Sequence, residues 1–575
     1  MSYIPTEAPF SDQQRAWLTG FLSGLQAQQH HLGTKIDVAQ SSQKLPISIL
    51  FGTQTGNSEE LANDAAEIAQ SRGYEPKVSE LDAVSMVEFA QIENAIIVVS
   101  TYGEGEMPDN AEVFWQALSA STAPRLENMS YAVLGLGDTS YDEFCHAGKL
   151  IDTRLEQLGA VRLASRIDCD VDYEEPASNW LDTVLVDKSV GSENPVIAKK
   201  EIIDGVSWNK KNPFLAPLVE NTLLSGHSSA KEIRHVVFDL SESGLTYEAG
   251  DALGVFPVNA KDLVQAILSR LGLKYDSFVD GYDLPIGTLL SNSFEIMTPS
   301  KQLVHFIEKI AQDEGLSKAI GTKDSLDKFL WGKDILDLLN LNPRITLSPE
   351  GFLENLKPLQ HRAYSISSSS KAAGSDVHLT VAAVRWQYQQ RMHKGVASTF
   401  LADRVEIGSS AGVFVSANKN FRVPADSNAP MIMVGPGTGI APFRAFLQER
   451  AQSGAKGMNW LFFGDQHRDS DFLYENELSQ MSSNGILSRL DLAFSRDQSE
   501  KVYVQNRMVE NGKELFRALD NGGHFYVCGD ASKMAKDVDK ALHQIVAQHG
   551  GLSDQASSDY VNSLKREKRY LRDVY

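Results

Sequence analysis

The chain has 575 residues, of which 42% are hydrophobic and 22% charged, and its formal net charge is −21 at pH 7. That length is typical of three or four globular domains, and the excess of acid argues against nucleic acid as a partner. No apolar run approaches the roughly 18 residues of a membrane helix, and the N-terminus has no signal-peptide pattern, so we expect a cytoplasmic protein without a membrane partner.

Cysteine usage fits the same compartment. The three cysteines, Cys145, Cys169 and Cys528, are too few for a disulfide framework and suit a reducing cytosol. They show no metal-ligand spacing, so we predict no zinc or iron–sulfur site held by this chain.

Residues 1–44 precede the first β/α pattern. Residues 10–29 are predicted to form an amphipathic helix that begins at Ser11. Its apolar stripe consists of Trp17, Leu18, Phe21, Leu22 and Leu25. This stripe packs either on the chain's own next domain or on another subunit.

Residues 45–186 alternate apolar strands with helical segments. The predicted strands are 47–51, 95–100 and 131–136, and the predicted helices are 58–71, 111–118 and 147–158. This alternation predicts a doubly wound parallel sheet of the flavodoxin-like kind, in which ligands bind beyond the carboxyl ends of the strands.

Three loops at those strand ends predict an FMN site. Hydroxyls and N–H groups at a helix N-terminus hold a phosphate without lysine, glycines allow close approach to a planar ring, and Tyr102 and Tyr141 can stack on it. The first loop contains Thr53, Gln54, Thr55, Gly56, Asn57 and Ser58; the second contains Ser100, Thr101, Tyr102 and Gly103; the third contains Leu136, Gly137, Asp138, Thr139, Ser140, Tyr141, Asp142, Glu143, Phe144 and Cys145.

Residues 187–213 are rich in Ser, Gly, Asn and Pro and predict a flexible linker. Residues 214–427 then show short strands, at 233–240, 377–385 and 412–415, which predict a β-barrel. The stretch from about 258 to 350 reads as helical and predicts an insertion into that barrel.

The barrel carries residues suited to FAD. Arg362 fits a pyrophosphate, Tyr364 fits a flavin face, and Ser365 can hydrogen-bond to the reactive edge of the ring. Ala363 lies between them in sequence. A later run can begin a helix beneath the pyrophosphate. It consists of Gly395, Val396, Ala397 and Ser398.

Residues 428–575 return to β/α alternation and predict a nicotinamide dinucleotide site. The glycine-rich loop 435–442, with Gly437 and Thr438, directly follows the strand 431–434. Ser495, Arg496 and Lys501 follow a later strand, and a hydroxyl with two cations suits the 2′-phosphate of NADPH rather than the ribose hydroxyl of NADH.

Two further features of this domain point to the hydride site. Cys528 follows a strand and has no activating base nearby in sequence, so we expect it to orient the nicotinamide rather than attack. The terminal Tyr575 is expected to cover the flavin face that the nicotinamide must later reach.

Together these motifs resemble the diflavin reductase family over residues 45–575. The run Gly-Pro-Gly-Thr-Gly-Ile-Ala-Pro at 435–442 and Tyr-Val-Cys-Gly-Asp at 526–530 carry much of that resemblance. Within the family the chain is most similar to the flavoprotein alpha components of bacterial NADPH-sulfite reductases, through Gly-Asp-Ala-Leu-Gly-Val at 250–255, Ser-Arg-Asp-Gln at 495–498 and the C-terminal Tyr-Leu-Arg-Asp-Val-Tyr.

The resemblance implies an electron path and a partner. NADPH gives a hydride to FAD, FAD passes electrons singly to FMN, and FMN reduces a hemoprotein beta component, which carries siroheme and an iron–sulfur cluster and reduces sulfite to sulfide for cysteine biosynthesis. It also implies a homo-oligomer assembled through the N-terminal region. The alternatives are a soluble diflavin reductase serving another heme or cobalamin protein, and a flavin-binding assembly subunit without NADPH turnover.

The resemblance also assigns residues. Ser365, Cys528 and Asp573 are implied as catalytic groups that position the nicotinamide. Further FAD contacts are implied at Thr380, Val381, Ala382, Trp386 and Tyr575, and further NADPH contacts at Val502, Tyr503, Val504, Gln505 and Asp537. Trp386 stands where the family pattern has a tyrosine, which keeps stacking but removes a hydroxyl.

Acids cluster near the FMN loops and predict a docking face for a basic patch on the acceptor. They are Glu104, Glu106, Asp109, Glu112, Asp142, Glu143 and the acids of 168–175. A merely solvated surface is the alternative.

Overall fold

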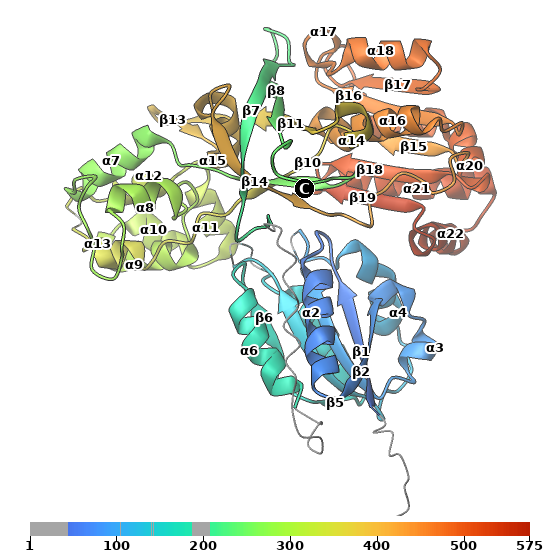
Figure 1. Cartoon of the computed structure of the whole chain (residues 1–575), viewed down its shortest axis with the longest axis horizontal. Coiled ribbons are helices and arrows are strands. Elements are labelled where there is room, and N and C mark those ends of the chain that lie inside the picture. Colours follow the sequence, from blue (N-terminus) through green and yellow to red (C-terminus); the bar gives the residue numbers. More distant parts are fainter. Residues whose placement is uncertain (1–43, 104, 140, 142, 187–207, 345) are drawn as a thin grey trace, which may run out of the picture.

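The computed structural model describes residues 44–103, 105–139, 141, 143–186, 208–344 and 346–575. The predicted N-terminal helix, most of the predicted linker, and Glu104, Ser140 and Asp142 lie outside the described residues. Figure 1 shows one α/β part below, a β-rich part at the centre with helices to its left, and a second α/β part to its right. The C-terminus lies in the middle of this view, among the three parts.

The first part is a parallel sheet with strand order β2-β1-β3-β4, and both β5 and β6 pair with β4. Buried apolar runs such as 95–99 form its central strands, as expected where helices cover both faces. Its elements are β1 (Leu45–Gly52), α2 (Asn57–Ser71), β2 (Tyr74–Glu80), η1 (Leu81–Ala83), α3 (Met86–Phe89), β3 (Asn94–Ser100), η2 (Asp109–Ala111), α4 (Glu112–Ser119), β4 (Ser130–Leu136), α5 (His146–Gln157), β5 (Val161–Arg162), β6 (Ile167–Cys169) and α6 (Glu174–Val184). The order reverses between β1 and β3, which confirms the flavodoxin-like prediction and places a ligand site beyond these two strands.

The second part is an antiparallel sheet with strand order β10-β9-β14-β7-β8-β11. An isolated bridge between Ile366 and Leu379 joins its two end strands, so the sheet closes as predicted. Its elements are β7 (Phe214–Leu223), β8 (Glu232–Asp239), β9 (Ala252–Phe256), β10 (Arg362–Ser365), α14 (Ser370–Ala373), β11 (Asp376–Ala383), β12 (Arg385–Tyr388), β13 (Arg391–Lys394), α15 (Val396–Thr399), η3 (Phe400–Arg404) and β14 (Ser410–Ser416). The strands β12 and β13 form a separate hairpin outside the barrel sheet.

Short helices fill the chain between β9 and β10, within the predicted insertion. They pack around their own apolar cluster, which includes Val264, Ile267 and Ile307, and Trp386 of the β12–β13 hairpin packs against it. The helices are α7 (Lys261–Leu271), α8 (Ile286–Asn292), α9 (Lys301–Ala311), α10 (Glu314–Ala319), α11 (Lys323–Leu330), α12 (Ile335–Leu339) and α13 (Pro349–Leu353). Below, we call them the connecting helices.

The third part is a parallel sheet with strand order β17-β16-β15-β18-β19. Its elements are β15 (Met431–Val434), η4 (Gly437–Ile440), α16 (Ala441–Ser453), β16 (Asn459–Asp465), α17 (Arg468–Asp471), α18 (Glu475–Ser483), β17 (Arg489–Phe494), α19 (Val504–Glu510), α20 (Gly512–Asp520), β18 (His524–Gly529), α21 (Met534–Gly550), α22 (Asp554–Arg566) and β19 (Tyr570–Val574). The C-terminal run is therefore an edge strand of this sheet, in register with β18.

A polar cluster joins the barrel to the third part. The rings of His235 and His378 lie 4.9 Å apart, edge to face, and His235 Nδ1 lies 3.0 Å from the hydroxyl of Tyr474. The guanidinium of Arg444 lies 4.9 Å above the Tyr474 ring. Burial, with the nearby Arg444 charge, lowers the pKa of both histidines to about 4, so both are neutral at pH 7.

The lowered pKa of these two histidines predicts that the folded protein loses stability in acid. Because their folded pKa lies below the unfolded value of 6.5, the unfolded chain binds more protons, and stability falls as the pH drops from about 6.5 to about 4. The full effect is of the order of 3 kcal/mol per histidine. We expect His378→Gln to flatten this pH dependence in urea unfolding, whereas His227→Gln, at an exposed position, should keep it. An unchanged slope in His378→Gln would contradict this assignment.

Candidate cofactor sites

The loop after β1 has the features of a phosphate site. Gly56, in the left-handed region at φ 95°, directly precedes the 15-residue helix α2, and its N–H donates to the hydroxyl of Thr53 at 2.9 Å. The hydroxyl of Ser58, in the first turn of α2, is buried and has no hydrogen-bond partner in the described structure. An unpaired hydroxyl beside free N–H groups at a helix N-terminus fits a phosphate.

The other two predicted loops lie beside the first. The hydroxyl of Thr101 accepts a hydrogen bond from the N–H of Ala147 at 3.1 Å, which ties the second loop to α5. The N–H of Thr139 donates to Asp170 at 3.0 Å, which fixes the third loop. A Cβ on Gly137 would lie 2.8 Å from the backbone nitrogen of Cys145, so the close packing here requires glycine.

The remaining FMN candidates differ in exposure. Tyr141 is half exposed, whereas Cys145, at the end of the third loop, is fully buried, and burial raises its pKa to about 12 and keeps the thiol protonated. The hydroxyl of Tyr102 donates to the backbone oxygen of Val574 at 2.5 Å. In this arrangement Tyr102 therefore joins the FMN loops to the C-terminal strand.

A cavity of about 710 Å³ lies between the barrel, the connecting helices and the third part. Its volume is that of a site for a large cofactor. The predicted residues that line it are Arg362, Ala363, Tyr364, Ser365, Thr380, Ala382, Trp386, Gly395, Val396, Ala397, Ser398, Thr438 and Tyr575.

Val381 does not line this cavity. Successive side chains of a strand point to opposite faces, so Thr380 and Ala382 face the cavity while Val381, 1% exposed, packs in the barrel core. Val504, 3% exposed, is likewise part of the core of the third part. A cofactor could therefore meet Val381 and Val504 only through their backbone, because a motif does not show which of its side chains the local element turns inward.

The three predicted catalytic residues meet at the edge of the cavity. The hydroxyl of Ser365, on β10, donates to Asp573 Oδ2, on β19, at 2.6 Å. The thiol of Cys528, on β18, lies 3.8 Å from the same oxygen. Burial, together with the Asp573 charge, raises the pKa of the thiol well above its usual value, and burial also raises the pKa of Asp573. The thiol is thus no thiolate nucleophile, in agreement with an orienting role.

Tyr575 lines the cavity and forms hydrogen bonds with η4 and with the end of β18 in the third part. Its hydroxyl lies 2.9 Å from that of Thr438, and its N–H donates to the oxygen of Gly529 at 3.0 Å. The side chain is 62% exposed. The terminal ring thus stands at the cavity, where the prediction places it over the flavin.

The glycine-rich loop after β15 packs tightly on β18. Gly437 has a φ of 59°, and a Cβ on Gly439 would lie 2.2 Å from the oxygen of Cys528. A cation that our sequence analysis missed lies near this loop: Lys231, between β7 and β8, pairs with Asp465 at 2.5 Å and would lie 3.9 Å from a Cβ on Gly437. No motif surrounds Lys231, so only the folding of that hairpin against β16 reveals it.

The predicted 2′-phosphate residues follow β17. Arg496 and Lys501 are exposed, as a site for a charged ligand requires, while Ser495 is 9% exposed. Gln505 donates to Asp537 at 3.3 Å, so these two candidates are neighbours although 32 residues separate them. Val502 and Tyr503 lie between Lys501 and α19.

Ion pairs hold the first part against later parts of the chain, and in each of them the first part supplies the acid. In the portion of the chain that the structure describes, the acids belong to the first part and the bases to later residues. The pairs are Glu59–Lys419, Glu80–Lys568, Glu106–Lys536, Asp109–Arg572, Glu112–Lys565, Glu112–Arg572, Asp138–Lys357 and Glu174–Lys210. Several acids of the predicted acceptor face therefore already form ion pairs with bases of the same chain.

Three protein families match successive parts of the chain. They are flavodoxin at residues 49–180, the FAD binding domain at 207–400 and the oxidoreductase NAD-binding domain at 433–540. FMN, FAD and NADPH are accordingly the cofactors of the three parts. Among the described helices, none has both the length and the apolar content that crossing a membrane requires.

Relatives match the whole chain. A Bacillus subtilis protein named sulfite reductase [NADPH] flavoprotein alpha-component is 40% identical over 100% of this chain and 96% of its own length. Proteins of the same name from Vibrio cholerae and Klebsiella pneumoniae are 41% and 38% identical over 99% and 98% of this chain, and 94% and 96% of their own lengths.

Arg496 gives a test of the nicotinamide nucleotide site. We expect Arg496→Ala to raise KM for NADPH roughly 10-fold, because a hydrogen bond to a charged group is lost, while KM for NADH stays unchanged. Steady-state kinetics with both nucleotides checks this. Arg125→Ala, which removes an equally exposed arginine from the first part, is the matched control. An unchanged ratio of NADPH to NADH preference would remove Arg496 from the 2′-phosphate.

Proposed function

We propose, for a chain that belongs to the sulfite reductase (NADPH) flavoprotein alpha-component family, that it is the electron-donating subunit of an assimilatory sulfite reductase. Its partner is a hemoprotein that reduces sulfite to hydrogen sulfide for cysteine biosynthesis, and its compartment is the cytoplasm. The observation that carries the proposal is the meeting of all three cofactor parts at one strand, β19, in a chain similar to these relatives along its full length.

The bound cofactors supply hydride transfer from NADPH to FAD and single-electron transfer onward to FMN. The chain's residues then have separate tasks. Ser495, Arg496 and Lys501 hold the 2′-phosphate and so select NADPH. Arg362 neutralises the FAD pyrophosphate, and Tyr364 covers the flavin face.

The hydride site works by orientation. Asp573 accepts a hydrogen bond from Ser365 and contacts Cys528, so the three polar groups share one fixed geometry. Tyr575 leaves the cavity when the nicotinamide enters, and its return excludes water from the flavin. Together these groups align two rings rather than form a bond to either.

We also propose how the chain is organised. An assembly segment covers 1–44 and supports homo-oligomers, followed by an FMN domain at 45–186, a linker at 187–213, an FAD domain at 214–427 and an NADPH domain at 428–575. The acidic face of the FMN domain meets a basic patch of the hemoprotein. Since Glu106, Asp109 and Glu112 are paired with the NADPH domain, the acceptor competes with these internal partners.

A different heme or cobalamin protein as acceptor is the second candidate, because it would leave the three cofactor sites unchanged. The names of the full-length relatives favour sulfite reductase.

The acceptor is tested by NADPH-dependent sulfide production. The purified chain is mixed with a sulfite reductase hemoprotein and sulfite, with cytochrome c and a P450 as alternative acceptors. We expect sulfide only when chain, hemoprotein and NADPH are all present. Cytochrome c reduction without sulfide would contradict the proposal and favour the second candidate. Sulfide production that persists in Arg125→Ala and falls in Arg496→Ala at limiting NADPH would tie the activity to the nucleotide site.

A further inference from the structure

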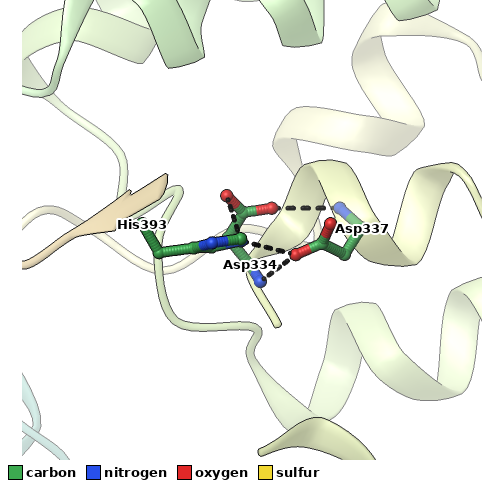
Figure 2. A group of neighbouring side chains, drawn as sticks. All are labelled: Asp334, Asp337 and His393. Carbon is green, nitrogen blue, oxygen red and sulfur yellow. Dashed lines mark hydrogen bonds and ion pairs between the residues drawn. The ribbon is translucent and has the colours of Figure 1, made fainter. Parts of the chain in front are cut away.

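A buried polar cluster stands behind the FAD cavity. His393, on β13, is 2% exposed, and Asp334, which caps α12, is 1% exposed. Imidazole Nε2 lies 2.7 Å from Asp337 Oδ2 and 3.4 Å from Asp334 Oδ2. Figure 2 shows the ring of His393 directed at both carboxylates, which come from the start of α12. The cluster therefore ties the β12–β13 hairpin to the connecting helices.

Two carboxylates and an imidazole are also metal-ligand types, yet this cluster already holds a cation. A guanidinium nitrogen of Arg391 lies 2.5 Å from Asp334, 2.9 Å from Asp337 and 2.9 Å from His393 Nε2. A metal ion bound to the same atoms would lie against this guanidinium. The paired charges allow Asp334 to be buried and Asp337 to be nearly so, at 13% side-chain exposure.

The cluster supports Trp386. In the hairpin register Trp386 is directly opposite His393, and its indole stacks on the imidazole with ring centres 5.5 Å apart and planes 23° apart. The indole N–H donates to the oxygen of Gly332 at 3.0 Å, and Gly332 lies two residues before Asp334. One segment, 332–337, thus fixes Trp386 both directly and through His393.

Trp386 is also a wall of the cavity assigned to FAD. The same hairpin leads directly into the cavity loop, because His393 lies two residues before Gly395, whose neighbours Val396 and Ser398 line the cavity as well. The contact that His393 itself makes with a wall of the cavity is the stacking on Trp386, so a shift of His393 displaces that wall.

We propose that His393 is a positioning residue for FAD: held by Asp334 and Asp337, it backs Trp386 so that the indole stacks on a planar ring of the cofactor. This inference rests on the proposed function, because it takes the cavity as the FAD site. His393 does not line the cavity, so it acts on the cofactor through Trp386 alone.

The test is a double-mutant cycle read as the Kd of FAD for the deflavinated full-length chain, measured by fluorescence titration. We expect His393→Ala to weaken FAD binding roughly 3- to 10-fold, since an aromatic contact is lost, and Trp386→Ala to weaken it at least about 10-fold. If His393 acts through Trp386, the double variant equals Trp386→Ala within about 2-fold.

The controls separate positioning from general destabilisation. Met392→Ala, at the exposed neighbouring position, should leave Kd unchanged, and FMN content should stay at wild-type level in every variant. His393→Phe keeps a ring beside Trp386 but loses the contact with Asp337; it should show a smaller loss of affinity, and it decides the question if His393→Ala does not fold.

Two results would overturn the proposal. Losses that multiply in the double variant would show that His393 acts independently of Trp386. Wild-type Kd in His393→Ala and His393→Phe, with weakened binding in Trp386→Ala, would show that the indole needs no support. If Trp386→Ala also binds FAD normally, the assignment of this wall to FAD fails, and with it this part of the proposed function.

Discussion

The C-terminal strand β19 is the constraint on which the three cofactor sites depend. Its parallel pairing with β18 places Asp573 opposite Cys528, and this register brings the carboxylate to Ser365 on the barrel. The flanking residues, Arg572 and Val574, contact the FMN domain instead. Alternation along the strand thus directs the Asp573 side chain to the proposed hydride site and the Arg572 side chain to the FMN domain, whereas Val574 meets that domain through its backbone oxygen.

The ion pairs between the FMN domain and the rest of the chain include the best protected ones beside that strand. Arg572, with 20% of its side chain exposed, needs nearby acids, and Asp109 and Glu112 supply them from the FMN domain. Lys565, which also pairs with Glu112, is similarly protected, with 10% of its side chain exposed. The pairs of Lys568 and Lys536, with side chains 55% and 63% exposed, are individually weak and sensitive to salt. The contact is therefore firm near Arg572 and easily broken at its rim, which suits the proposed docking of an external acceptor on this domain.

Local motifs were enough to predict much of this account. The shared role of Ser365, Cys528 and Asp573 as catalytic groups was implied by the family resemblance alone. The glycine-rich loops, the doubly wound sheet of the first part and the barrel with its helical insertion were anticipated, because each depends on a short run of residues. Features made by distant segments were not: Lys231 at the dinucleotide loop and the bond from Tyr102 to Val574 leave no local pattern. The motifs also did not show that the side chains of Val381 and Val504 face the core, because the direction of a side chain depends on the element that carries it.

The central claim is that β19 couples the hydride site to the FMN domain through different residues. Stopped-flow reduction by NADPH tests it in Arg572→Ala, with Lys318→Ala, in an exposed ion pair of the connecting helices, as control. Loss of a mostly buried charge pair weakens docking, so we expect FMN reduction to slow at least about 10-fold while FAD reduction stays within about 2-fold of wild type. Unchanged FMN reduction, or equal slowing of both flavins, would contradict the claim.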